Sequence, residues 1–325
     1  MRNAALALVL AAALPLAAQN LTNAHLTTVR ASADLAAQVH GAAGWIGYSV
    51  PAAPNFRGND CGYCSLGDDH GNWTNDSRPL EPARDAMILY RVAAGSVERI
   101  RDYSSRCSVD GDGMNVTWIE NVDPRSSIRF LATLIDDTHH QALAALAAHA
   151  DESATEVLEK IARSDRPTKT RGDALFWLGL ARGHRGYEIV HSITTNPNEP
   201  AALREKGIFA MSQSRQPEAI DDVLQIAKHD ESSRVRGQAL FWLSQAAGKK
   251  AAGALRDAVD HDPDASVKEK AIFGIAQLPD DQSIPLLADL MRNHKSPNIR
   301  KKAAFWLGQK NDPRAVAAIE DLLKR

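Results

Sequence analysis

Apolar residues recur with a helical period over the C-terminal half of the chain, and the pattern itself repeats. Similar short apolar motifs begin, at nearly constant spacing, at Ala142, Ala174, Gly207, Ala239, Ala271 and Ala303. A period of about 32 residues with two helical patterns in each unit is typical of a solenoid, because a single helix pair cannot bury its apolar face alone. We predict five helix pairs over residues 150–310, a lone helix at Gln141–His149 before them and a closing helix at Pro313–Lys324.

Acidic and basic residues mark the turns within the predicted pairs. In Asp230–Arg236 and Asp262–Lys268 an acid stands in the turn and a base in the first turn of the next helix. The bases at this register are Arg171, Arg204, Arg236, Lys268 and Arg300. This pattern resembles HEAT repeats, particularly the short HEAT-like repeats shared with phycobilisome lyases, whose turn Asp and following Val-Arg form a ladder between successive units. The resemblance spans residues 138–325 and departs from that pattern where Ser296 replaces the acid before Arg300.

The resemblance implies that the helix after each such turn lines the concave face of the solenoid. These helices carry Phe176, Phe209, Phe241, Phe273 and Phe305. From Phe209 onward, polar residues stand three and four positions from each Phe, which indicates a wet or rim position at helical spacing. We predict that the five Phe form a partner-binding row flanked by Gln213, Gln245, Gln277 and Gln309. The alternative is that each Phe packs against the next repeat.

A second aromatic series directly follows the Phe positions. Trp177, Trp242 and Trp306 alternate there with the small residues Ala210 and Gly274. A large ring beside the gap left by a small residue is typical of packing by complementary volume. We therefore expect the three Trp to belong to the core of the solenoid.

The N-terminal part of the chain, up to Asp137, differs in composition from the rest. Every Lys lies at or after Lys160, and four of the five Tyr lie at or before Tyr103, which indicates a domain boundary between residues 130 and 150. A helical segment at Ala31–His40 precedes runs typical of strands, at Trp45–Val50, Met87–Val92, Val97–Tyr103 and Val116–Ile119. The predicted fold class is therefore mainly α, with a small α+β domain at residues 19–137 before a right-handed α-solenoid of HEAT-like helix pairs at residues 138–325.

Residues 1–18 have the layout of a secretory signal peptide. Arg2 precedes an apolar run from Ala4 to Leu14, and Pro15 and small residues follow before Gln19. The run is too short to anchor the chain in a bilayer. We expect cleavage after Ala18, export to a periplasmic or extracellular compartment, and no membrane insertion after the signal is removed.

All three Cys of the chain lie in the predicted N-terminal domain. An oxidising compartment favours one disulfide, which joins Cys107 to Cys61 or Cys64. Two alternatives are a thioredoxin-like Cys-Gly-Tyr-Cys site, whose flanks are typical of loops, and a zinc site on Cys61, Cys64, His70 and Cys107. The nearby run Asp110–Gly113 does not fit a calcium loop, and we expect a tight turn there between strands.

The net charge of the chain and the motifs that it lacks limit the classes of function that fit the sequence. Thirty-eight basic and 40 acidic residues give a net charge of -2, which does not favour binding to nucleic acid. Among HEAT-like relatives, the deoxyhypusine hydroxylases hold iron on His-Glu dipeptides, which this sequence lacks, and no hydrolase or phosphate-binding motif occurs. We predict an exported, non-enzymatic module without a cofactor that binds a protein or peptide on its concave face. The alternative is a metal- or thiol-dependent enzyme centred on Cys61, Cys64, His70 and Cys107.

Overall fold

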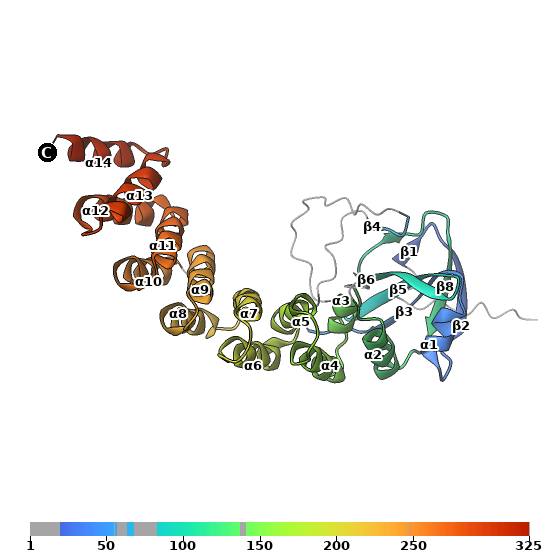
Figure 1. Cartoon of the computed structure of the whole chain (residues 1–325). Coiled ribbons are helices and arrows are strands. Elements are labelled where there is room, and N and C mark those ends of the chain that lie inside the picture. The colour runs from blue at the N-terminus through green and yellow to red at the C-terminus, as the bar shows by residue number, and fades with distance from the viewer. Residues whose placement is uncertain are drawn as a thin grey trace, which may run out of the picture. The chain divides into compact units, whose positions relative to one another are not determined.

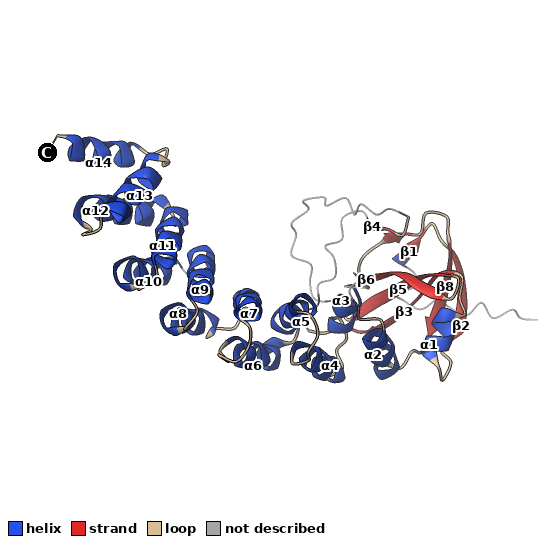
Figure 2. Cartoon of the chain, in the orientation of Figure 1, coloured by secondary structure: helices blue, strands red, loops and turns tan. Residues whose placement is uncertain are grey.

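The chain folds into two compact units, residues 1–154 and 155–325. The computed structural model describes residues 20–54, 56, 64–67, 83–136, 141–246 and 248–324, so the predicted signal peptide lies outside the described residues. Strands are confined to the first unit, and the second is built from helices (Figure 2). The predicted fold class is confirmed as mainly α, a repeat of helix pairs that follows a small α+β domain.

Five strands form the main sheet of the first unit, in the order β2-β8-β3-β5-β6. The strands β3 (Gly44–Pro51), β5 (Asp85–Ala93) and β6 (Ser96–Ser104) are antiparallel neighbours. In contrast, β8 (Asn115–Glu120) runs parallel to both β3 and the edge strand β2 (His25–Arg30). The sequence predicted four of these strands and missed β2, because the side chains of this edge strand are mostly exposed and give no apolar run.

Two tight turns connect strands of the first unit, and the sequence predicted the second of them. Ala94 and Gly95 have φ values of 50° and 75°, which is the left-handed pair that a two-residue hairpin turn between β5 and β6 requires. Between β7 (Val109–Asp110) and β8, the backbone N–H of Asp112 donates to the Asp110 carboxylate at 2.8 Å. This polar loop is therefore the predicted turn.

The main sheet is covered on both faces. On one face, Trp45, Met87 and Trp118 pack against the small parallel sheet β1-β7-β4, with β1 at Leu21–Thr22 and β4 at Cys64–Ser65. On the other face, Phe130 of α2 (Pro124–Thr133) contacts the ring of Tyr90 at 5.4 Å. The short helix α1 (Leu35–His40) also lies against α2, with His40 5.5 Å from Phe130 (Figure 1).

A buried chain of hydrogen bonds explains why α3 (Gln141–Ala147) belongs to the first unit. The carbonyl of Ala145 can only accept, so His149 Nδ1 donates to it at 2.8 Å and Nε2 accepts from Ser127 Oγ at 2.8 Å. Tyr48 bridges Ser127 and Tyr90 at 2.6 Å each, and burial raises the pKa of Tyr48 to about 12. Because Ser127 and His149 are fully buried, this serine–histidine pair is closed to a substrate and serves structure.

The second unit is a stack of helix pairs followed by a closing helix. The outer members are α4 (Ser153–Ala162), α6 (Gly183–Thr194), α8 (Ala219–His229), α10 (Gly248–His261) and α12 (Asp280–Asn293). The inner members are α5 (Thr168–Ala181), α7 (Ala201–Gln213), α9 (Ser233–Ala246), α11 (Ala265–Gln277) and α13 (Pro297–Gly308), and α14 (Pro313–Leu323) closes the stack. Within this unit the inner helices line the inside of a curve (Figure 1). Across the described part of the chain, no helix has both the length and the apolar character needed to cross a bilayer.

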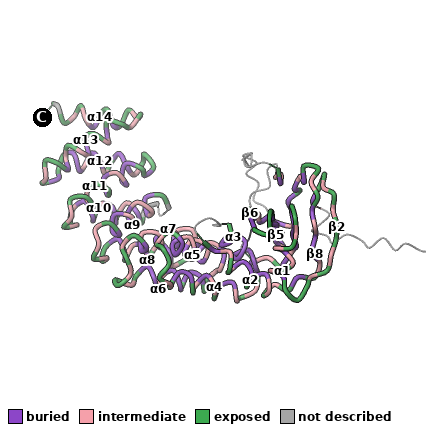
Figure 3. Tube along the Cα trace, turned by 45° about the vertical axis from the view of Figure 1, so that its right-hand side comes forward, coloured by how far each residue is buried: buried purple, intermediate pink, exposed green. Residues whose placement is uncertain are grey.

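From α7 onward each inner helix packs against the outer helix that precedes it, and consecutive inner helices pack against each other from α5 to α13. Buried positions therefore recur on every helix of the stack (Figure 3). Two glycines permit close approaches around α7, because a Cβ on Gly179 would lie 2.5 Å from the Ala210 carbonyl oxygen and one on Gly207 would lie 1.9 Å from Thr194 Oγ1. The absence of a side chain thus sets how tightly α7 packs against α5 and α6.

Two helix-interior glycines provide a matched test of this packing. We expect Gly207→Ala to destabilise the protein by about 1 to 3 kcal/mol, because the added methyl overlaps the buried Thr194 side chain. In contrast, a Cβ on Gly253 of α10 meets no atom within 4 Å, so Gly253→Ala should stabilise by up to about 1 kcal/mol. Urea unfolding followed by circular dichroism measures both. Equal effects of the same sign would contradict the close approach at Gly207.

Candidate functional site

The five predicted Phe occupy one register on the five inner helices. Phe176, Phe209, Phe241 and Phe273 are half-buried, and Phe305 is 58% exposed. The apolar residue directly before each of the first four Phe and the one two positions after every Phe, such as Leu240 and Leu243, are buried and hold the helix in the stack. The Phe side chains therefore lie at the boundary between the packed interior of the stack and the solvent.

Ring contacts join the Phe row along the stack. Phe176 stacks on Phe209 with ring centroids 5.6 Å apart and planes within 10° of parallel. Phe209 in turn lies 4.7 Å from Trp242, and Phe273 lies 5.2 Å from Trp306. Each of these contacts crosses from one inner helix to the next. Both interpretations of the sequence thus hold in part, since the rings pack between repeats and keep an exposed edge.

The expectation that the three Trp belong to the core is met only in part. Trp177, Trp242 and Trp306 are half-buried, and each touches the Phe that precedes it at centroid distances of 5.1 to 5.2 Å. Trp242 and Trp306 also pack on Phe rings of the preceding inner helix, so they contribute to the packing between repeats while they stay partly exposed. The alternation of large and small residues predicted that these positions on neighbouring helices lie close together, but it did not predict how far the Trp side chains are exposed.

One side of Trp242 borders a small recess. Ala219 and Val223 of α8 and Leu243 of α9 contribute to an apolar pocket of about 170 Å³ there. The indole Nε1 of Trp242 is buried and forms no hydrogen bond with any described residue. The recess can take one apolar side chain of modest size.

The predicted glutamines lie at the C-terminal ends of the inner helices. Gln245, Gln277 and Gln309 are exposed, and Gln213 is half-buried. Their contacts are weak or local, as when Gln213 Nε2 donates to Ser212 Oγ at 3.2 Å. The amides of Gln245, Gln277 and Gln309 therefore lie open to solvent at the helix ends.

The predicted ladder forms at three of its five bases. Arg236 makes a bidentate contact with Asp262 of the next turn, at 2.8 and 2.9 Å, and this hydrogen bonding raises the pKa of Arg236. Arg204 pairs with Asp230 at 2.7 Å, and Arg171 pairs with Glu199 at 2.7 Å. All three pairs are largely buried, so each one fixes the spacing between successive repeats.

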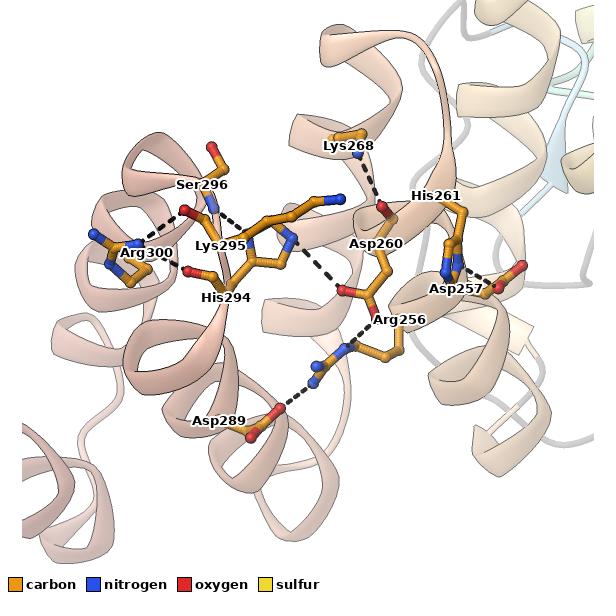
Figure 4. Close-up of polar contacts among 10 residues, drawn as sticks. All are labelled: Arg256, Asp257, Asp260, His261, Lys268, Asp289, His294, Lys295, Ser296 and Arg300. Atoms are coloured by element: carbon orange, nitrogen blue, oxygen red, sulfur yellow. Dashed lines mark hydrogen bonds and ion pairs between the residues drawn. The ribbon is translucent and has the colours of Figure 1, made fainter.

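At the next position of the ladder, Lys268 makes a backbone hydrogen bond in place of an ion pair (Figure 4). The position that corresponds to Asp262 is His294, so Lys268 has no acid to meet and donates to the backbone carbonyl of Asp260 at 3.1 Å. His294 is buried, with Nδ1 accepting from the Ser296 backbone at 3.0 Å and Nε2 3.6 Å from the Asp260 carboxylate. The predicted role of Lys268 as an ion-pair ladder residue is therefore wrong.

Two further side chains complete that region. Arg256 of α10 bonds to Asp260 at 2.9 Å and also to Asp289 of α12, which ties the two outer helices together. Arg300 donates to the carbonyls of His294 and Lys295 at 2.9 and 3.1 Å, so it holds its own turn rather than an acid in a following one (Figure 4).

The alternative site on the cysteines receives no support from the described residues. Cys61 and His70 lie outside them. Cys64 has a free thiol, whose pKa is raised by burial, and Cys107 lies in the core beside Trp118. Cys64 is therefore excluded as the disulfide partner of Cys107. Within the described ranges, no three His, Cys, Asp or Glu side chains are grouped as a metal ion would need.

The ladder gives a test of what holds the repeats together. We expect Asp262→Ala to destabilise the protein by about 3 to 5 kcal/mol, because it leaves the buried Arg236 charge without its partner. Asp221→Ala is the matched control, since Asp221 pairs with Lys250 at 2.7 Å but both side chains are more than half exposed, and it should cost less than about 1 kcal/mol. Chemical denaturation measures both. Similar small losses would show that the ladder does not stabilise the stack.

Comparison with known proteins supports the repeat architecture. A family model of HEAT repeats matches residues 187–272 and 251–325. Human deoxyhypusine hydroxylase is similar in structure at 16% identity, covering 61% of this chain and 90% of that one, with a TM-score of 0.31. The complex of CpcE and CpcF of phycocyanin lyase from Nostoc sp. PCC7120 is similar at 22% identity, covering 48% and 99%, with a TM-score of 0.35.

A third solved structure, YibA of E. coli, is similar at 19% identity over 63% of this chain and 82% of that one, with a TM-score of 0.35. No curated protein matches the sequence significantly. The model match covers the last four inner helices and the ladder residues Arg204 and Arg236. Residues 187–325 match the model of HEAT repeats, and the fold of the chain is a HEAT-like helical solenoid that follows a small α+β domain.

Proposed function

We propose that the repeat unit is an interaction module that binds another protein or a peptide through the concave face of its inner helices. The observation that carries this proposal is the row of five Phe at one register, four of them half-buried and Phe305 58% exposed. Aromatic side chains are enriched at the centres of protein interfaces, because they bury a large rigid area at low entropic cost. The HEAT-repeat fold, which offers extended inner surfaces, is consistent with this use.

The aromatic rings supply only part of the energy of a complex. Complete burial of one Phe is worth about 1.5 to 3 kcal/mol, and a half-buried ring has a minor part of that still to gain. Four or five such rings, with the half-buried Trp beside them, therefore need added hydrogen bonds and charged contacts with the bound chain to offset the cost of association. The exposed glutamines at the helix ends would then bond to the backbone of the bound chain and set its direction.

The proposed role is binding, with no reaction assigned to the chain. We place the protein outside the cytoplasm, in the periplasm or extracellular space, because Met1–Ala18 has the pattern of a signal peptide. In that oxidising setting Cys107 pairs with Cys61, since Cys64 is free and the sequence has only three Cys.

Thiol counting tests the pairing. The exported protein, denatured without reductant, should react with one equivalent of a thiol reagent, and with three after reduction. Cys64→Ser should abolish the reaction before reduction, whereas Cys61→Ser should leave two reactive thiols, Cys64 and Cys107. Three reactive thiols before reduction, released together with zinc, would instead favour a metal site on these cysteines.

The binding face is tested with a triple variant, Phe209→Ser, Phe241→Ser and Phe273→Ser. Peptides selected from a random displayed library on the native protein should bind the variant at least about tenfold more weakly, since tenfold is only about 1.4 kcal/mol and three rings are lost. Fluorescence anisotropy gives the affinities. Circular dichroism checks that the variant keeps its helices, because each half-buried ring also contributes to stability.

Val316→Ser is the control for that experiment, because Val316 is 54% exposed but lies on the closing helix α14 and not on one of the five inner helices. Its affinity for the same peptides should match that of the native protein. Unchanged binding by the folded triple variant would refute the proposed face.

A further inference from the structure

The inner helices of the repeat unit are rich in basic residues and poor in acidic ones. The five inner helices contain 11 Lys and Arg but only three acidic residues, whereas the five outer helices contain seven basic and ten acidic residues. The chain as a whole has a net charge of -2, so the excess of basic residues is specific to the inner helices and is not a general feature of the sequence. The face proposed for binding is therefore the electropositive one.

Ion pairs account for every acid on these helices. Glu205 accepts two hydrogen bonds from Arg234, the shorter at 2.7 Å, and Glu269 lies 3.0 Å from Lys302. Asp173 is 3.9 Å from Lys169. Each acid on the inner helices thus already has a basic partner from this chain.

Three cations remain once the ladder residues and these pairs are set aside, namely Lys206, Lys270 and Lys301. Among the described residues, none of the three has a hydrogen-bond or ion-pair partner. Lys270 and Lys301 are exposed, and Lys206 is half-buried along its aliphatic stem. Their charges are available to a ligand.

The stems of two of these lysines are held in place. A Cβ on Gly172 would lie 2.0 Å from Lys206 Cδ, and one on Gly237 would lie 2.6 Å from Lys270 Cδ, so each stem lies across a glycine of the preceding inner helix. Lys206 and Lys270 stand three residues before Phe209 and Phe273, a spacing that puts cation and ring on one side of the helix. The same design occurs twice, two repeats apart.

We propose that this face recognises an acidic segment of a partner protein, in which carboxylates meet Lys206, Lys270 and Lys301 and apolar side chains between them cover the Phe row. This inference rests on the proposed function. Inner helices two repeats apart are separated by roughly 20 Å at 8–10 Å per packed helix, which an extended chain spans in about six residues at ~3.3 Å each. Acidic residues about six positions apart therefore fit the two fixed lysines.

A nucleic acid fits this face less well than a peptide. It would bring a phosphate with every nucleotide, and phosphates between the lysines would meet Glu205 and Glu269. A peptide can place its carboxylates at the free lysines alone. The spacing of three isolated cations among aromatic rings therefore favours an acidic, apolar peptide segment.

Three matched peptide pools test the proposal on the full chain. The peptides, about 12 residues long and labelled with fluorescein, share their apolar positions and carry Glu, Gln or Lys at the other positions. At low salt the Glu pool should bind about tenfold more tightly than the Gln pool, with the Lys pool weakest, and the difference should shrink at high salt.

Charge-neutral variants locate the effect. In the triple variant Lys206→Gln, Lys270→Gln and Lys301→Gln, the preference for Glu over Gln should disappear, while the Gln pool binds as before. A control with three exposed outer lysines replaced, Lys160→Gln, Lys228→Gln and Lys250→Gln, should keep the preference.

The outcomes separate this inference from the proposed function. Equal binding of the Glu and Gln pools, still lost in the Phe→Ser triple variant, would overturn the acidic preference and leave the proposed function standing. No binding of any pool would overturn both. Tighter binding of a labelled single-stranded oligonucleotide than of the Glu pool would overturn the peptide proposal in favour of nucleic acid.

Discussion

Close stacking of successive inner helices is the constraint on which the repeat unit depends. Gly179 and Gly207 allow backbones and side chains to approach, and buried pairs such as Arg236 with Asp262 hold one turn to the next. Because the apolar stripe and the ladder share one register, every side chain at a given position recurs at a fixed spacing along the stack. The Phe row and the alignment of Lys206 with Lys270 are consequences of that register, since neither would line up if the helices slipped.

The ladder also shows how the stack accommodates a position at which the acidic residue is replaced. Where His294 replaces the acid, the contact between repeats passes to the outer helices, through Arg256 and its two carboxylate partners, Asp260 and Asp289. His294 itself remains buried and bonds to the turn before α13. The spacing between repeats is therefore maintained by a network in one place and by single ion pairs elsewhere.

The two units distribute their polar groups in opposite ways. In the first unit, Tyr90, Tyr48, Ser127 and His149 are sealed in the interior, where every bond serves to hold α2 and the segment after α3 against the sheet. In the second unit, the charged groups of the inner helices form ion pairs or hydrogen bonds within the chain, or they lie at the surface near the aromatic rings. A surface with fixed rings and unpaired cations is suited to recognising another chain.

Local patterns in the sequence determined the repeat, the helix pairs, four strands, the tight turns and the register of the Phe and ladder residues, because helical period, turn chemistry and strand alternation are read from neighbouring residues. Tertiary structure alone decided how far the Trp rings are exposed, which acids Arg234 and Lys302 neutralise, and that Lys206 and Lys270 have no ion-pair partner among the described residues. It also decided that Lys268 lacks an acid and that the edge strand β2 joins the sheet. These outcomes depend on contacts between residues about one repeat or more apart, whose distances exist only once the helices are stacked.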